Sequence, residues 1–246
     1  MKPILRKLVQ SPYLDVLGAL LIFGVCISRD FHGTTYQNGV IEFGTPISHL
    51  WSAMMSGAFP LGIVSIIGAV FSVLSTRLIG KQNNLGNIIG VFTTITSGSI
   101  DYMFGNHSAV ITYPVTFFIM VFAVNKWKQR SSLIRNRDQN YYLILLGSML
   151  LGFTLVYLGA YHFGGKTDHG FLIVVSIVFG LSLGGNICSA LKYEETWFSW
   201  VLYNFVQLIK NVIQLNLANV VKYIFYLFNA IITLFDWKWN RDVEPT

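Results

Sequence analysis

One apolar stretch, residues 197–214, carries polar side chains at the spacing of a single helical face. An indole heads the row, and amides follow at steps of four, three, four and three residues: Trp200, Asn204, Gln207, Asn211 and Gln214. Trp197 extends the row by one turn. Residues three or four apart share a helical face, and amides are costly in hydrocarbon unless they meet partners or water. The row therefore predicts the wall of a polar cavity inside a helical bundle.

The chemistry available to this row is binding rather than catalysis. An indole face attracts cations by roughly 0.5–2 kcal/mol and stacks on flat rings, while each amide offers donors and an acceptor. The sequence has no glycine-rich phosphate loop, HExxH motif, paired carboxylates or nucleophile beside a base, so we expect no enzyme. The same amides could instead hold helices together, at ~0.6 kcal/mol for an average polar pair.

The composition is that of an integral membrane protein. Of the 246 residues, 53% are hydrophobic and 11% charged, and the mean hydropathy is +0.56, whereas soluble domains carry about 25% charged residues. Segments of ~20 apolar residues can cross a bilayer, and such segments leave no room for a soluble catalytic domain. The net charge of +6 would favour nucleic acid in a soluble protein. Here we expect the lipid bilayer as a partner and no nucleic acid.

Eight apolar segments are expected to form spanning helices: residues 13–28, 57–78, 84–104, 109–124, 141–161, 170–191, 197–215 and 219–235. The first is the weakest candidate because it holds Asp15. The basic and then apolar N-terminus resembles a signal peptide but lacks a cleavage site of small residues, which favours an uncleaved helix. An interfacial helix is expected from Ile47. No strands are expected, because an open sheet edge is not tolerated in lipid.

Lys and Arg are distributed unevenly between the two sides of these segments. Arg29 and Lys166 fall on the outer side. Lys210 and Lys222 lie near the outer ends of their spans, where we expect them to snorkel outward. The positive-inside rule therefore makes both termini cytoplasmic. The other thirteen of the 17 basic residues fall on the same side of the membrane as the N-terminus: Lys2, Arg6, Lys7, Arg77, Lys81, Lys126, Lys128, Arg130, Arg135, Arg137, Lys192, Lys238 and Arg241.

The chain resembles itself at a shift of 110 residues. Residues 106–128 align without a gap with residues 216–238, and the third span carries a polar row in the same phase as the seventh. This predicts an all-α membrane protein with two parallel three-helix repeats, a linker helix between them and an extra N-terminal helix. Parallel repeats are a transporter architecture that holds substrate near mid-membrane. The expected divisions of the chain are residues 1–56, 57–128, 129–169, 170–241 and 242–246.

Several polar residues inside the spans have two readings. Tyr113 and Tyr223 occupy matching places in the two repeats and could be pocket walls or paired core aromatics. Asn186 follows two glycines deep in the sixth span and could line a pocket. Trp197 could contact a ligand or belong to an interfacial aromatic belt. Asp101 lies toward the outer end of its span, where we expect it to be hydrated, although it could attract cations at an entrance.

No cofactor or metal site is expected. Cys26 and Cys188 fall inside apolar segments, which argues against a disulfide or a metal site. The five histidines have no metal-ligand spacing and fall at helix ends or in loops. The sequence leaves the oligomeric state open, so a homo-oligomer stays a possibility.

The pattern Trp197-x2-Trp200-x3-Asn204 at the start of the penultimate span resembles the signature of PnuC-type vitamin transporters, which import nicotinamide riboside into bacteria. The three-one-three layout and the ending DWKWNR are similar to that family too, over roughly residues 57–241. The first span resembles a helix present in only some members. The resemblance implies facilitated diffusion across the bacterial inner membrane without a coupling ion. It also implies that a cytoplasmic kinase traps the imported nucleoside.

Nicotinamide riboside has a flat cationic ring, a carboxamide and a ribose, which suit stacking on tryptophan and hydrogen bonding to amides. The two tryptophans favour it over thiamine or another nucleoside of the same family. A SWEET-like sugar facilitator shares the layout, and a non-transporting scaffold is disfavoured by the polar rows. The expected substrate contacts are Trp197, Trp200, Asn204, Gln207, Asn211, Asn87, Thr94, Tyr113, Tyr223 and Asn186.

Overall fold

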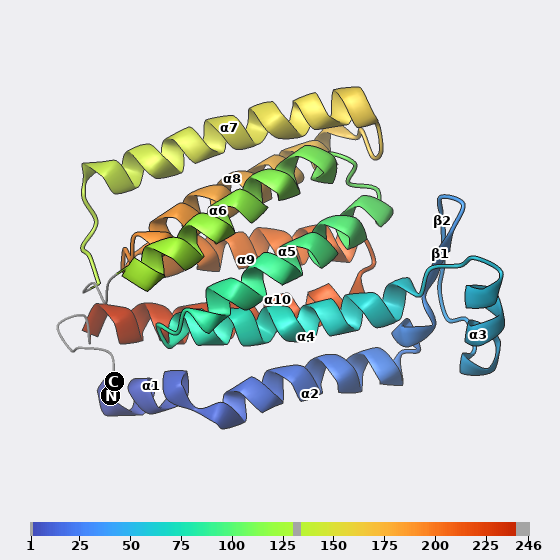
Figure 1. Ribbon diagram of the computed structural model, residues 1–246, viewed down its shortest axis with the longest axis horizontal. Helices are drawn as coiled ribbons and strands as arrows, with labels where there is room; N and C mark the ends of the chain where they lie inside the picture. Colours follow the sequence, from blue (N-terminus) through green and yellow to red (C-terminus); the bar gives the residue numbers. More distant parts are fainter. Residues whose placement is uncertain (1, 130–133, 240–246) are drawn as a thin grey trace.

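The computed structural model describes residues 2–129 and 134–239, and most of them lie in helices (Figure 1). Each predicted span corresponds to one helix, which confirms a mostly helical protein. A 3₁₀ turn, η1 (Phe31–Gly33), and strands β1 (Thr35–Gln37) and β2 (Val40–Glu42) follow the second helix. The helices are α1 (Lys2–Gln10), α2 (Pro12–Ser28), α3 (Ile47–Met55), α4 (Leu61–Gly80), α5 (Leu85–Met103), α6 (Ala109–Gln129), α7 (Gln139–Phe163), α8 (His169–Ala190), α9 (Thr196–Ile213) and α10 (Leu217–Trp239).

Five of these helices are long and apolar enough to cross a membrane: α4, α6, α7, α8 and α10. Within the described ranges, α1 and α2 form a further candidate as one span bent by 56°. Helices α5 and α9 have 19 and 18 residues, and both carry rows of polar side chains. These lengths and compositions are those of a multi-pass membrane protein.

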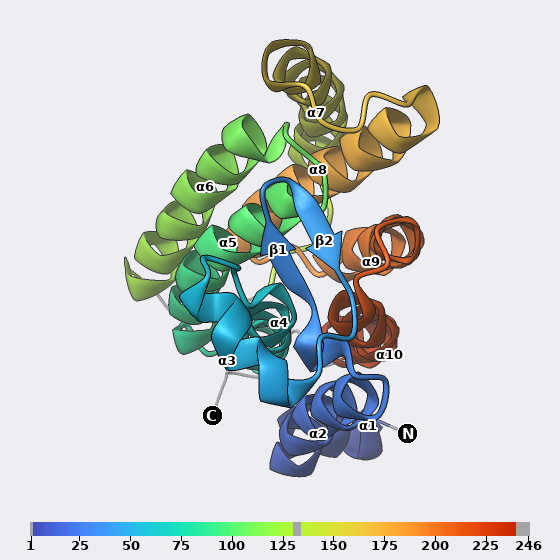
Figure 2. The ribbon, with the colours of Figure 1, turned by 90° about the vertical axis from the view of Figure 1, so that its right-hand side faces the viewer.

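The helices pack as two triplets. Helices α4, α5 and α6 contact one another in succession and form the first triplet, and α8, α9 and α10 form the second in the same way. The triplets meet where α4 contacts α10 and where α6 contacts α8. Helix α7 lies along α8 and α6, and α2 lies along α4 and α10 (Figure 2). Each seam between the triplets is thus covered by one further helix.

Backbone features recur at the 110-residue shift. Gln82 and Lys192, which follow the first helices of the two triplets, both have a positive φ, of 60° and 58°. Gly105 and Leu215 follow the middle helices, with φ values of 93° and 59°. Left-handed residues are costly for side chains other than glycine. Their recurrence therefore reflects a shared helix-ending geometry rather than shared residue types.

Two tryptophans close the same end of the triplets in matching ways. Trp127 Nε1 in α6 donates to the carbonyl oxygen of Ser189 at 3.3 Å, across one seam. Trp237 Nε1 in α10 donates to the carbonyl oxygen of Gly80 at 2.9 Å, across the other seam. Each indole satisfies a carbonyl near a helix end, where intrahelical partners run out.

The N-terminal helices are anchored by one buried arginine. Arg77 is 1% exposed. It donates to Asp15 in α2 at 2.7 Å and to Asn229 in α10 at 2.8 Å. Lys81 Nζ also reaches Asp15, at 2.5 Å. Asp15, the reason to doubt the first span, is therefore paired. Arg77 also donates to the carbonyl oxygens at the bend between α1 and α2, those of Leu8, Val9 and Ser11.

The expectation of no strands is wrong. β1 and β2 form an antiparallel hairpin, and Asn38 and Gly39 between them have φ values of 52° and 85°. Two residues with positive φ are typical of the type I′ turn, for which Asn-Gly is a preferred pair. The hairpin lies beyond one end of the helical bundle (Figure 1), where the prohibition on sheet edges in lipid does not apply. We call this the hairpin end of the bundle.

A helix does begin at Ile47, as expected, and this is α3. Its residues Ile47, Trp51 and Met55 follow one another at steps of four and are 70%, 69% and 73% exposed. An exposed apolar row beside the start of a spanning helix suits a membrane interface. The interfacial position itself stays a prediction.

Candidate functional site

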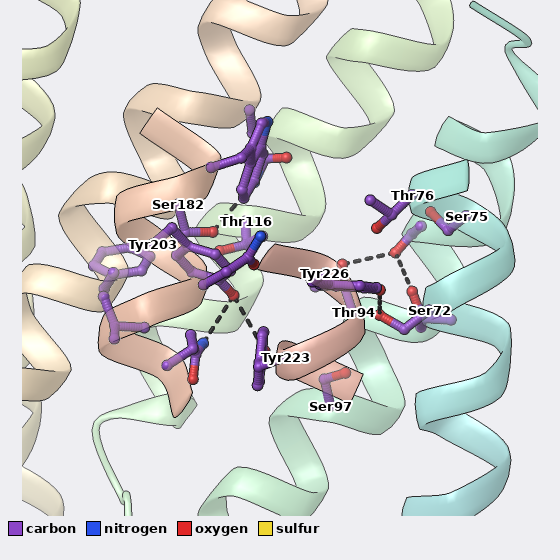
Figure 3. A pocket seen from close by; sticks show the side chains of 18 of the residues that line it. Ser72, Ser75, Thr76, Thr94, Ser97, Thr116, Ser182, Tyr203, Tyr223 and Tyr226 are labelled. Carbon is purple, nitrogen blue, oxygen red and sulfur yellow. Dashed lines mark hydrogen bonds between the residues drawn. The ribbon is translucent and has the colours of Figure 1, made fainter. Parts of the chain in front are cut away.

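A cavity of about 150 Å³ lies between the two triplets. Its lining comes from all six triplet helices, α4, α5, α6, α8, α9 and α10. Figure 3 shows side chains converging on this space from both triplets. Polar groups on several helices that point at one enclosed space are typical of a binding site.

Aromatic side chains from α9 line the part of the cavity toward the end opposite the hairpin. Trp197 is 1% exposed and packs edge-on against Trp237, with ring centroids 5.6 Å apart. Trp200 lies one turn further along and packs edge-on against Tyr203 at 5.1 Å. The backbone of Gly185 in α8 passes close to the Trp200 ring, where an added Cβ would lie 3.3 Å away.

The amides of α9 form a ladder of hydrogen bonds. Asn211 Nδ2 donates to Gln207 Oε1 at 3.1 Å and to the Gln207 carbonyl oxygen at 2.8 Å. Gln207 Nε2 donates to the Tyr203 hydroxyl at 2.8 Å, and that hydroxyl lies 3.5 Å from the Tyr223 hydroxyl (Figure 3). The ladder holds the ring of Tyr203 in place beside Trp200.

Two polar atoms in the cavity wall have no hydrogen-bond partner among the described residues. They are Trp197 Nε1, a donor, and Asn204 Oδ1, an acceptor. Both side chains are buried, at 1% and 2% exposure, and both line the cavity. A buried polar group without a partner costs about 1–3 kcal/mol. A guest whose polar groups reached these atoms would remove this cost.

Hydroxyl groups cover much of the cavity wall that faces α9, which is formed by α4, α5 and α6. Tyr226 donates to Ser72 Oγ at 2.8 Å (Figure 3). Thr94 Oγ1 donates to the Gly90 carbonyl oxygen at 2.8 Å. A hydroxyl that donates inward to its own helix keeps its lone pairs for another donor. The further hydroxyl residues labelled in Figure 3 on this part of the lining are Ser75, Thr76, Ser97 and Thr116.

The structure brings most of the expected contact residues together. Asn211 and Asn87 do not line the cavity: Asn211 supports Gln207, and Asn87 Nδ2 donates to Asn84 Oδ1 at 3.0 Å. Whether the residues on the lining contact substrate stays a prediction. Those on the lining are Trp197, Trp200, Asn204, Gln207, Thr94, Tyr113, Tyr223 and Asn186.

The expected hydration of Asp101 and outward snorkelling of Lys210 are both wrong. Their side chains are 7% and 3% exposed, and Lys210 Nζ lies 2.9 Å from Asp101 Oδ1 and 3.0 Å from Oδ2. Gln214 Nε2 donates to Asp101 at 2.9 Å and Asn106 Nδ2 at 2.6 Å, while the Tyr113 hydroxyl lies 3.4 Å away. A buried ion pair persists only with such additional hydrogen bonds. This pair joins α5 of the first triplet to α9 of the second.

Lys222 also stays inside the protein rather than snorkelling outward. It is 3% exposed and lines the cavity. Its Nζ lies 4.4 Å from the ring centroid of Tyr223 and 5.9 Å from that of Tyr226. Aromatic faces stabilise a desolvated ammonium group, so the lysine does not need to reach water.

Reasoning along single helices missed these charged residues. A lysine near a span end is by default expected to reach the interface, and its partner Asp101 is 109 residues away in the chain. The 110-residue shift held a usable signal, because it pairs Asp101 with Asn211, the neighbour of Lys210. Tyr203 and Tyr226 were missed because aromatic residues in spans are ordinarily packing residues.

Within the described ranges, no cluster of His, Cys, Asp or Glu is arranged to hold a metal ion. Cys26 and Cys188 are both buried free thiols. The chemistry of the cavity is that of hydrogen bonding, ring stacking and one fixed ion pair.

A polar cavity enclosed between two helix triplets of a multi-pass bundle is the arrangement in which membrane transporters hold their substrates. The model of the family described as nicotinamide mononucleotide transporter matches residues 62–239, and the chain belongs to this family. The fold is similar to a crystal structure of the vitamin B3 transporter PnuC, with a TM-score of 0.62 and 14% identity, over 74% of this chain and 83% of that chain. No curated protein matches the sequence. The protein is thus a transporter and not an enzyme.

We predict that breaking the ion pair between the triplets from one side destabilises the protein. Asp101→Asn should lower the free energy of unfolding by about 3–5 kcal/mol, because it leaves Lys210 buried without its counter-charge. The double variant Asp101→Asn/Lys210→Met should lose less than the two single variants together. Thermal and denaturant unfolding of the purified protein in detergent would measure this.

The matched control is Arg137→Met, since Arg137 is 62% exposed and lies 3.8 Å from Glu195. A surface pair of this kind contributes about 0–1 kcal/mol. Single variants at Asp101 and Lys210 that unfold like this control would show that the pair does not hold the triplets together.

Proposed function

We propose that this protein imports nicotinamide riboside by facilitated diffusion, with the substrate bound between the two triplets. The observation that carries the proposal is the pairing of Trp200 with the unpartnered acceptor of Asn204 in one buried cavity. An indole suits the cationic ring, and the amide suits a carboxamide or a ribose hydroxyl. The family and the similar structure are named for compounds that share the nicotinamide ring.

The riboside is favoured over the mononucleotide by the charges in the cavity. A phosphate group would bring up to two negative charges, which require cationic partners. Lys210 is paired with Asp101, which leaves Lys222 as the single unpaired cation of the described lining to balance two phosphate charges. Hydroxyl groups dominate the remaining polar lining, and these suit an uncharged sugar. Tighter binding of the mononucleotide than of the riboside by the purified protein would contradict this choice.

The proposal includes eight spans in the bacterial inner membrane. Helices α5 and α9 would complete the spans, with α4–α6 and α8–α10 as parallel repeats, α7 as the linker and α2 as the extra helix. Support comes from the helix endings that recur at the 110-residue shift and from the seams that Trp127 and Trp237 close alike. In parallel repeats joined by one linker helix, the first helix of each repeat enters the membrane from the same face.

Reporter fusions should place both ends of the chain in the cytoplasm. The positive-inside rule predicts a cytoplasmic signal for a fusion after Arg137 and for another at the C-terminus. A fusion after Gly57, on the far side of α2, should report the periplasm and serves as the opposite control. A periplasmic signal from either of the first two fusions would refute the eight-span topology.

Transport should depend on the substrate gradient alone. Proteoliposomes should take up labelled nicotinamide riboside until the concentrations on both sides are equal, with or without a proton or sodium gradient. In cells, phosphorylation by a cytoplasmic kinase would then retain the nucleoside. Empty liposomes are the control. Accumulation above the external concentration that an ionophore abolishes would show an ion-coupled transporter instead.

Stacking on Trp200 should be measurable in the affinity for substrate. If stacking contributes about 1–2 kcal/mol, Trp200→Ala should weaken binding about ten- to thirtyfold, and Trp200→Phe should restore part of it. Asn204→Leu should cost more than Asn204→Ala, because leucine also fills space. Titration calorimetry with nicotinamide riboside, thiamine, thymidine and glucose would separate the riboside from the alternative substrates.

Trp51→Ala is the matched control, because Trp51 lies on α3 outside the bundle and is 69% exposed. It should leave affinity unchanged. Folded Trp200→Ala and Asn204→Leu proteins that bind like the wild type would place the substrate site elsewhere.

A further inference from the structure

The two triplets contribute side chains of unequal size to the cavity. Along α5 and α9, the positions that both line the cavity at the 110-residue shift pair a small residue with a larger one: Gly90 with Trp200, Thr93 with Tyr203, Thr94 with Asn204 and Ser97 with Gln207. Along α6 and α10, Thr112 pairs with Lys222 and Thr116 with Tyr226. Along α4 and α8, Thr76 pairs with Asn186, whereas Ile79 and Ser189 have the opposite order. Two pairs are identical: Ser72 with Ser182, and Tyr113 with Tyr223.

This inequality decides where free space can lie. Side chains of α9 and α10 extend into the middle of the bundle, whereas α5 presents a glycine and short hydroxyl residues. An added Cβ at Gly90 would lie 2.3 Å from Met120 Cε and 3.2 Å from Ser75 Oγ, so these two side chains occupy the space in front of the glycine. Free space on the α5 side is therefore left at Thr94 and Ser97, whose short side chains line the cavity together with the amides of α9.

The α5 wall presents hydrogen-bond acceptors. Thr93 and Thr94 both donate to the Gly90 carbonyl oxygen, at 3.1 and 2.8 Å. Each hydroxyl has one proton and two lone pairs, so their lone pairs are left for donors in the cavity. Across the space, Asn204 is 2% exposed with an unpartnered Oδ1. A guest with several hydroxyl groups, which donate as well as accept, fits between these walls.

We propose that Thr94 and Ser97 form the specificity-determining wall of the transporter and seat the sugar of the nucleoside. This rests on the proposed function and deepens it: α9 would bind the ring, and α5 would bind the ribose and limit its size. The second triplet thus recognises the base, and the first triplet recognises the sugar.

Two ligands separate the wall from the ring site. Nicotinamide riboside carries both parts, whereas 1-methylnicotinamide keeps the cationic ring and the carboxamide without a sugar. Thr94→Val, an exchange of equal volume, should weaken binding of the riboside about two- to tenfold through one lost hydrogen bond. Ser97→Leu, which fills the space, should weaken it more than about tenfold. Neither variant should change the affinity for 1-methylnicotinamide by more than about twofold. Loss of a ring contact would weaken binding of this ligand too.

The same exchanges on the exposed side of α5 are the controls. Thr96 and Ser99 are exposed, and their hydroxyls also donate to backbone carbonyls of α5, so Thr96→Val and Ser99→Leu should leave both ligands unaffected. Trp200→Ala should weaken both ligands alike. Equal losses for both ligands in Thr94→Val, or no loss for either, would overturn the sugar wall while the proposed function stands. A wild-type protein that binds neither ligand would overturn both.

Discussion

The ion pair between Asp101 and Lys210 joins the two triplets inside the bundle, at the cavity that both of them line. It is the one described ion pair that crosses from α5 to α9, and it lies toward the hairpin end of the cavity. Taking two charges out of water costs several kcal/mol per ion. The amides of Gln214 and Asn106 offset part of this desolvation cost because they donate hydrogen bonds to the Asp101 carboxylate. The polar network around the cavity is therefore anchored from both sides.

The two triplets share a backbone arrangement but differ in the side chains that line the cavity. Positive φ values, seam contacts and indole hydrogen bonds recur at the same shift. At most of the paired cavity positions, however, the second triplet carries the larger side chain. Unequal lining leaves an enclosed space on one side, which suits a guest without internal symmetry.

The sequence could predict the helices and most of the cavity because both follow from spacing along single spans. The polar row of α9 identified Trp200, Asn204 and Gln207, and the 110-residue shift led to Thr94. Spacing along one helix cannot reveal contacts between helices. In the sequence, Asp101 and Lys210 are two separate charged residues near span ends, whereas in the structure they form an ion pair. The hairpin was missed for a different reason, since the rule against strands in lipid was applied to a segment outside the bundle.

The same ion pair bears on how transport is driven. A carboxylate that couples transport to protons or sodium must be able to take up and release an ion during the cycle. Among the residues that line the described cavity, Asp101 is the one carboxylate. Its oxygens accept from an ammonium group and two amides, with a phenol hydroxyl nearby. A proton or a sodium ion would have to displace these donors and leave Lys210 uncompensated. This cost supports a passive transporter in which the carboxylate of the cavity lining pairs the two halves rather than binding an ion.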